Sequence, residues 1–185
     1  MSLLRKTGFF VAVLVLVGVL SAGHVFAEEI FNIEKIMQSA KDGDPVSQAA
    51  LGAAYLKGRG VPVDYAEAVR WYRASAEQGD RRGQTGLGFM YFFGQGVVQD
   101  YTEAAVLFRK AADQEDPMAQ AALGISCKYG WGVPTDKVTA LMWFVLGAKM
   151  YKVSADERDA LVQELSRTQI DEAYRRADEW RPIRP

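Results

Sequence analysis

Apolar residues return at helical spacing through most of this chain of 185 residues. Over residues 44–57, Ala, Leu and Tyr recur three or four positions apart and would form one apolar stripe on a helix. Gly58 and Gly60 interrupt this pattern, and apolar residues resume the same spacing after Asp64. The pattern predicts two helices joined by a glycine-containing turn, each with one face to bury.

The same helical pair occurs three times, at intervals of 36 residues, beginning at Asp44, Asp80 and Asp116. Ten positions of the unit hold the same residue in every copy, and no gap is needed to align them. They include Gln48, Gln84 and Gln120, Leu51, Leu87 and Leu123, Ala68, Ala104 and Ala140, and Ala76, Ala112 and Ala148. Because one hairpin cannot bury its apolar face alone, the copies must stack. The sequence therefore predicts an all-α fold, a right-handed α/α solenoid of three full 36-residue hairpins.

Short signals mark where the predicted helices begin and end. Asp44 is an N-cap residue with Pro45 at the first helical position, and Gly58 suits the left-handed conformation that ends a helix. Asp64 and Glu67 have the spacing of a capping box at the start of the second helix. The signals recur at Asp80, Gly94, Asp100 and Glu103, and again at Asp116, Pro117, Gly130 and Asp136. The third copy has Thr139 in place of the glutamate, so its box is incomplete.

Glycine also occupies one position inside each first helix, at Gly52, Gly88 and Gly124. Each of these glycines costs about 1 kcal/mol of helix stability relative to alanine. Their return in every copy predicts a close approach between the two helices of a hairpin.

The repeated stretch "LGAAYLKGRGVPVDYAEAVRWYRASAEQGD" and its two partners resemble the Sel-one-like repeat family, a relative of the tetratricopeptide repeat. The resemblance covers residues 44–151. It implies an α-solenoid that acts as an adaptor or scaffold, often in the bacterial cell envelope. Secreted relatives with paired cysteines in each repeat differ from this chain, which has only Cys127.

Residues outside the three repeats predict caps for the stack. Residues 30–43 resemble the second helix of an incomplete preceding unit, and residues 28–43 form a predicted N-terminal capping helix. Residues 152–185 form the predicted C-terminal capping helices. We expect these helices to begin at two capping boxes, Ser154 with Glu157 and Ser166 with Gln169.

The first 27 residues have the pattern of a secretory signal peptide. Arg5 and Lys6 precede an uncharged apolar segment over residues 8–22, and Ala27 ends a small-residue cleavage site. Cleavage would remove two basic residues and the only histidine, His24, and would leave a net charge of about −3. We therefore expect a periplasmic or secreted protein. The alternative is an uncleaved anchor that holds the chain at the inner membrane, facing the periplasm.

The chemistry of the mature chain argues against catalysis. Without histidine it lacks the commonest general base and metal ligand, and we expect no catalytic residue, no metal and no cofactor. None of its glycine turns has a nucleotide-binding pattern, and its negative charge argues against a nucleic-acid partner. Cys127 falls where the other copies have Tyr55 and Tyr91, so we expect a buried, inert thiol.

The variable positions of the first helices are the predicted site. We expect a protein-binding surface at Phe89, Phe92, Phe93, Ile125, Lys128, Tyr129 and Trp131, on the concave side of the stack. One or two of the phenylalanines could instead fill gaps between repeats. Alanine at Phe89 and Phe92 should weaken partner capture with little loss of stability if both are exposed, and should lower the melting temperature if they are core.

Together these features predict an exported scaffold that binds another envelope protein or peptide. Two alternatives remain open. One is an accessory subunit of an inner-membrane complex, tethered by the N-terminal helix. The other is a weak cell-wall-directed hydrolase or wall-fragment binder, which would require a carboxylate pair in an apolar pocket.

Overall fold

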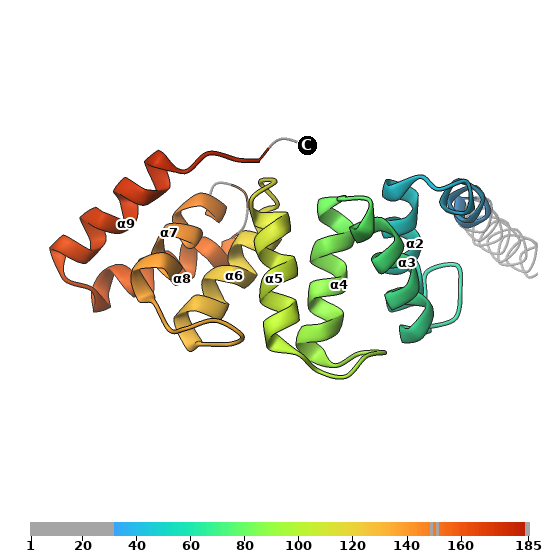
Figure 1. Ribbon diagram of the computed structural model, residues 1–185, viewed down its shortest axis with the longest axis horizontal. Coiled ribbons are helices and arrows are strands. Elements are labelled where there is room, and N and C mark those ends of the chain that lie inside the picture. Colours follow the sequence, from blue (N-terminus) through green and yellow to red (C-terminus); the bar gives the residue numbers. More distant parts are fainter. Residues whose placement is uncertain (1–31, 149, 151, 184–185) are drawn as a thin grey trace, which may run out of the picture.

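The computed structural model describes residues 32–148, 150 and 152–183, and the secondary structure of these residues is helical throughout. Residues 32–41 form a helix ahead of the first repeat. The elements that follow are α2 (Pro45–Lys57), α3 (Tyr65–Glu77), α4 (Arg81–Phe93), α5 (Tyr101–Ala112), α6 (Pro117–Tyr129), α7 (Lys137–Gly147), α8 (Lys152–Glu164) and α9 (Arg167–Glu179). Figure 1 shows the hairpins side by side in a single row. The predicted all-α solenoid is confirmed, whereas the predicted signal peptide and residues 28–31 lie outside the described residues.

The aspartates that precede the repeat helices are N-caps, as the sequence predicts. The carboxylate of Asp64 accepts the backbone N–H groups of Ala66 and Glu67 at 2.9 and 3.0 Å. The predicted reciprocal half of this capping box is wrong, because the Glu67 side chain bonds to Arg70 (2.7 Å) and to the indole N–H of Trp71 (3.1 Å) instead. The glutamate therefore joins the first two turns of α3 and leaves the capping to Asp64.

The glycines inside the first helices receive aromatic rings from the second helices. A Cβ atom added at Gly88 would lie 2.6 Å from Cε1 of Phe108, which is far too close for van der Waals contact. Gly52 meets Tyr72 and Gly124 meets Phe144 in the same way. The predicted close approach within each hairpin is confirmed, and its cause is a ring that lies against the backbone of the partner helix.

The two glycines of each turn have different tasks. Gly94 ends α4 in the left-handed conformation (φ 65°), as expected for a C-cap. Gly132 also has positive φ (73°), but its backbone lies directly against the carbonyl of Tyr101 in the preceding repeat. A side chain at this position would collide with that carbonyl. The second glycine of the turn is therefore a contact between repeats as well as part of a helix end.

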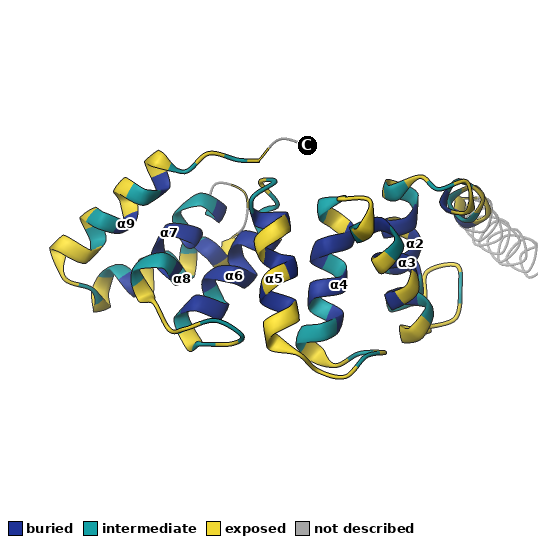
Figure 2. Ribbon diagram, in the orientation of Figure 1, coloured by how far each residue is buried: buried dark blue, intermediate teal, exposed yellow. Residues whose placement is uncertain are grey.

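The core lies between the hairpins and is largest in repeats two and three. Phe108, Trp143 and Phe144 are fully buried within it. Figure 2 shows the buried faces of α4 to α7 turned toward one another, while α9 is exposed along most of its length. Cys127 belongs to this core, and burial raises the pKa of its thiol to about 11. The predicted buried position of Cys127 is confirmed, and its thiol is neutral at ordinary pH.

One of the two predicted C-terminal capping boxes is wrong. Ser154 lies inside α8 with its side chain fully buried, so it does not begin the helix. Glu157 bonds to Lys128 at 2.8 Å rather than to the backbone of Ser154. At the start of α9, by contrast, Ser166 and Gln169 form the complete reciprocal box. The S-x-x-E pattern at residues 154–157 reflects a contact between helices instead of a helix start.

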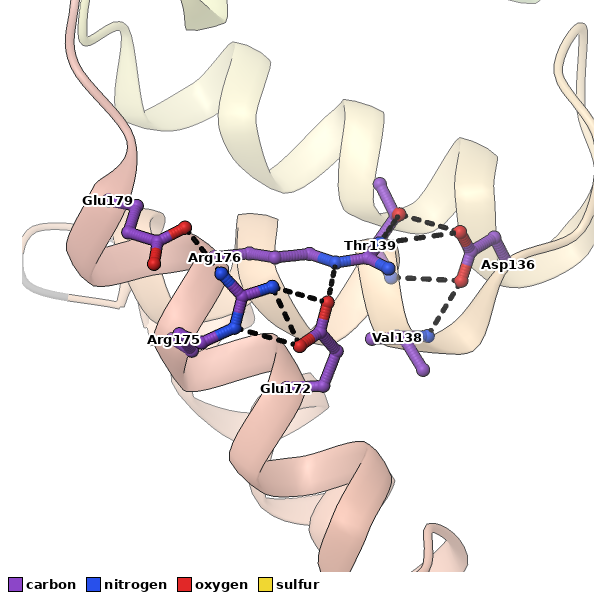
Figure 3. Close-up of polar contacts among 7 residues, drawn as sticks. All are labelled: Asp136, Val138, Thr139, Glu172, Arg175, Arg176 and Glu179. Carbon is purple, nitrogen blue, oxygen red and sulfur yellow. Dashed lines mark hydrogen bonds and ion pairs between the residues drawn. The ribbon is translucent and has the colours of Figure 1, made fainter.

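Polar side chains hold α9 against the beginning of α7 (Figure 3). The guanidinium of Arg176 donates to Glu172 (2.7 Å) on its own helix and to the hydroxyl of Thr139 (3.2 Å) on α7. It also lies 4.0 Å from the carboxylate of Asp136, the residue that caps α7. The hydroxyl of Thr139 donates to the same carboxylate at 2.6 Å. Thr139, which stands in the third copy where the others have glutamate, thus helps to attach α9 to α7.

Candidate interaction surface

The sides of α2, α4 and α6 that their own second helices leave uncovered form one surface, here called the first-helix face. Residues four, seven and eleven positions apart share one side of a helix, so this face is built from four columns of equivalent residues. The columns are Val46, Arg82 and Met118; Ala50, Gly86 and Ala122; Ala53, Phe89 and Ile125; and Lys57, Phe93 and Tyr129. Two members are covered, because Ala122 is buried in the core and Gly86 lies against the ring of Tyr72 on α3. Only Lys57 and Arg82 in the four columns carry a charge. The face is therefore mainly apolar, with its large side chains in repeats two and three.

Six aromatic rings form a continuous group at one edge of this face. We call it the aromatic cluster; its members are Phe89, Phe92, Phe93, Tyr101, Tyr129 and Trp131. The ring of Phe92 lies 5.0 Å from Phe93, 5.1 Å from Tyr101 and 5.4 Å from Trp131, in edge-to-face arrangements. Trp131 in turn stacks on Tyr129 at 5.0 Å. The cluster thus joins α4, the start of α5 and the loop after α6.

Exposure divides the cluster into two parts. Phe93 is 60% exposed, Tyr129 is 52% exposed, and Tyr101 and Trp131 are each 37% exposed. Phe89 and Phe92 are partly buried and pack against the fully buried Phe108, with ring separations of 4.9 and 6.3 Å. Phe89 and Phe92 therefore pack between the exposed rings and the core. This agrees with the alternative expectation that one or two of the phenylalanines fill gaps between repeats. Alanine at Phe92 should cost stability, so Phe93 is the better probe of binding.

The two remaining predicted residues, Ile125 and Lys128, make contacts within the fold. Ile125 is partly buried and packs against the core. The ammonium group of Lys128 pairs with Glu157 of α8 at 2.8 Å and lies 5.3 Å from the ring centroid of Tyr129. The hydrogen bond to Glu157 raises the pKa of Lys128. Its side chain is 12% exposed, so Lys128 holds the C-terminal cap in place rather than facing a partner.

Sequence reasoning missed Tyr101, which completes the cluster. Its ring stacks on Trp131 at 6.1 Å with an interplanar angle of 19°. The close approach of Gly132 to the Tyr101 backbone places Trp131, its neighbour in the chain, over the start of α5. Gln99 then fixes the tyrosine, because its amide donates to the Tyr101 hydroxyl at 3.0 Å. The first copy also has a tyrosine at this position, Tyr65. That repetition was the one signal in the sequence that the residue after the capping aspartate could contribute an aromatic ring to the surface.

No second aromatic cluster of this kind can form in the first repeat. The equivalent positions there hold Ala53, Leu56, Lys57, Arg59 and Tyr65, of which only Tyr65 is aromatic. Among the described residues of the repeats, the large exposed aromatic surface therefore lies in repeats two and three.

Neither a cluster of metal-ligating side chains nor a membrane-spanning helix is found in the part of the chain that the structure describes. Over residues 32–148, 150 and 152–183, no group of three or more His, Cys, Asp or Glu side chains is placed to hold a metal ion. In the same part of the chain, no helix is both long and apolar enough to cross a membrane.

Comparison with known proteins agrees with this architecture. The Sel1 repeat model matches residues 45–80, 81–116 and 117–151. A Sel1 repeat protein from Oxalobacter formigenes is 34% identical, with a TM-score of 0.62 over 70% of this chain and 98% of its own. A protective antigen of uropathogenic Escherichia coli that displays an SLR fold is 33% identical, with a TM-score of 0.75 over 80% of this chain. This chain spans about a third (32%) of that antigen's length. No curated protein matches. On the repeat matches and these two structures, the chain belongs to the Sel1 repeat family.

Proposed function

We propose that this chain is an exported scaffold that captures a protein or peptide partner of the cell envelope on its first-helix face, around the aromatic cluster. Sel1 repeat proteins are generally scaffolds for protein interaction and generally not enzymes. The proposal adds the place of binding, the kind of contact and the compartment.

The observation that carries the proposal is the group of exposed rings at Phe93, Tyr101, Tyr129 and Trp131. Binding energy at protein interfaces concentrates in a few aromatic and arginine side chains, with Trp and Tyr prominent among them. These rings are held in place by one another and by Phe92 beneath them. A ring that is already ordered loses little conformational entropy when a partner arrives, which favours binding.

The proposed compartment is supported by the N-terminal sequence alone. Arg5, Lys6, the apolar segment of residues 8–22 and the small residue Ala27 together have the pattern of a cleaved export signal. Mass spectrometry of the N-terminus of the protein purified from cells tests this. A chain that begins at Glu28 supports export with cleavage, whereas a chain that retains residues 1–27 supports the inner-membrane tether instead.

A capture experiment with matched variants tests the binding surface. We expect the double variant Phe93→Ala/Trp131→Ala to lose most of the envelope proteins that the unchanged chain retains after cross-linking. Tyr65→Ala is the control, because Tyr65 is 42% exposed at the position equivalent to Tyr101 but lies outside the cluster. Equal capture by the unchanged chain and the double variant, with both folded, would show that the partner binds elsewhere.

No observation favours the hydrolase alternative. The carboxylates with a resolved shift, Asp44, Asp136, Glu164 and Glu172, have lowered pKa values, whereas an acid catalyst needs a raised one. Asp44 and Asp136 cap helices, and Glu164 and Glu172 lie in ion pairs. Asp136 also lines a pocket, where no second carboxylate accompanies it.

A further inference from the structure

The segment that follows α9 turns back over the turns that join the repeats. α9 ends at Glu179, and Trp180 already has extended backbone geometry (φ −62°, ψ 138°). Three residues later, the amide of Ile183 donates a hydrogen bond of 2.8 Å to the carbonyl of Asp113, between α5 and α6. Figure 1 shows this tail along the edge of the stack opposite to the α4–α5 loop. The tail therefore runs on the other edge of the molecule from the aromatic cluster.

The beginning of the tail is firmly anchored. The partly buried ring of Trp180 packs against the core, edge to face with the fully buried Trp143, at a centroid separation of 6.0 Å. The anchor sets the direction in which the tail leaves α9. Its path over the turns is therefore a defined contact that begins in the core and ends at Asp113.

The tail lines one part of a groove of about 510 Å³. Pro182 and Ile183 form that part of the wall, and the rest is lined by residues 78–82, 114 and 115 and by Pro45 and Val46 at the start of α2. We call it the loop-edge groove. It crosses the turns between the first and second repeats and between the second and third.

The walls of the groove are fixed by hydrogen bonds across the repeats. The guanidinium of Arg81 donates to the carbonyl of Gln114 at 3.1 Å, and the amide of Gln114 donates to the carbonyl of Gly79 at 2.9 Å. Pro45 and the half-exposed Val46 provide apolar surface at the far end. The groove thus has apolar surface, and the Asp113 carbonyl at the turn accepts a main-chain hydrogen bond. An extended peptide with proline and aliphatic side chains can use both.

The two turns that the groove crosses are built alike. The turn that contains Asp113 has an equivalent one repeat earlier, with the same main-chain bond in both: Asp80 to Ser75 at 3.2 Å and Asp116 to Ala111 at 3.1 Å. Both turns therefore present the same backbone geometry to a peptide that crosses them.

We propose that the loop-edge groove is a docking site for an extended, proline-containing peptide of a partner protein, and that the tail, through Pro182 and Ile183, covers one end of it as an intramolecular ligand. The tail's Arg-Pro-Ile sequence shows the chemistry that the site accepts: a backbone N–H directed at the turn, a proline and an aliphatic residue. A partner peptide that bonds to the Asp113 carbonyl must displace Ile183, so the tail lowers the apparent affinity of the site. This site is independent of the aromatic cluster and of the function proposed for it.

Fluorescence anisotropy with a labelled peptide, Arg-Pro-Ile-Arg-Pro, tests the proposal directly. The peptide is titrated with the unchanged chain, with a chain that ends at Trp180, and with Ile183→Pro, which keeps the tail but removes the donated N–H. A tethered segment competes at an effective concentration of about 1 mM, so a peptide Kd of about 0.1 mM predicts about tenfold tighter binding once the tail is removed. We expect Ile183→Pro to move the affinity in the same direction.

Matched variants locate the site. In the chain that ends at Trp180, Val46→Asp should abolish peptide binding, whereas Val98→Asp, at an exposed valine in the α4–α5 loop, should not. A peptide with alanine in place of both prolines should bind several-fold more weakly, because it is less preorganised in the extended form.

Three results would overturn the proposal: equal affinity for the unchanged and shortened chains, equal effects of the two aspartate variants, or a tail-dependent dimer in sedimentation analysis. The dimer would mean that the tail serves a second copy of the chain. If the shortened chain does not fold, Ile183→Pro alone decides between the outcomes.

Discussion

A pair of glutamines joins the two helices of a hairpin, and Gln114→Met isolates its contribution. The amide of Gln114, in the turn after α5, donates to Oε1 of Gln84 on α4 at 2.9 Å and to the carbonyl of Gly79 at 2.9 Å. Gln78 and Gln48 form the same pair in the first repeat, at 2.7 Å. Methionine is the natural replacement, because the third repeat has Met150 at the equivalent position.

The structure sets the size of the expected effect. Gln84 is only 5% exposed, so water cannot easily replace the lost donor to its oxygen. An unsatisfied buried acceptor costs about 1–3 kcal/mol. The Gly79 carbonyl lies in an exposed turn, where water can bond to it, and methionine has nearly the volume of glutamine. We therefore expect Gln114→Met to lower the free energy of unfolding by about 2 kcal/mol.

Urea unfolding followed by far-UV circular dichroism measures this difference. Gln163→Met is the control, because Gln163 is exposed on α8 and should change stability by less than about 0.5 kcal/mol. The double variant Gln84→Leu/Gln114→Met removes the acceptor together with the donor, so it should be more stable than the sum of the two single variants predicts. A Gln114→Met chain as stable as the control, or strictly additive effects, would refute the reasoning.

Three further predictions concern the cluster, the thiol and the cap. Phe92→Ala should lower stability by about 2 kcal/mol and Phe93→Ala by less than about 1 kcal/mol, because only Phe92 packs against the core; thermal unfolding separates the two. Burial raises the pKa of Cys127 from 9.0 to about 11, so iodoacetamide at pH 8 should react much more slowly with the folded than with the unfolded chain. Because the folded state favours the neutral thiol, its contribution to stability should be complete below pH 9 and lost as the pH rises towards 11. Lys128→Met removes the ion pair with Glu157 and should cost about 1 kcal/mol, with faster amide exchange in α8; unchanged exchange there would contradict the assigned role of Lys128.

Local and repeated features of the fold could be predicted from the sequence. A capping aspartate such as Asp64 acts on backbone groups two or three residues away, so its role is visible in a short stretch of sequence. The close approach at Gly88 could be predicted because a glycine that destabilises the helix recurs in every copy. In the structure, the ring of Phe108 packs in the space that this glycine leaves. Repetition converts one ambiguous residue into three consistent ones.

Features that depend on contacts between helices could not be read in this way. Ser154 and Glu157 have the spacing of a capping box, but Lys128, on another helix, binds the glutamate, and Ser154 is buried inside α8. The exposure of Phe93 and the partial burial of Phe89 likewise depend on where the ring of Phe108 lies. Helical spacing indicates which residues share a side of one helix, but not which of them a neighbouring helix covers.

The aromatic cluster shows how a packing contact between repeats can set the position of a side chain on the surface. Gly132 must be glycine because the turn that contains it lies on the backbone of Tyr101 in the preceding repeat. That approach carries the variable residue between the two glycines of the turn over the start of the preceding second helix. In repeat three this residue is Trp131, which stacks on Tyr101, whereas the earlier turns have Arg59 and Gln95. A Sel1 turn thus holds its middle residue at a fixed place on the surface, so substitution at this one position can change the binding chemistry of the edge without disturbing the stack.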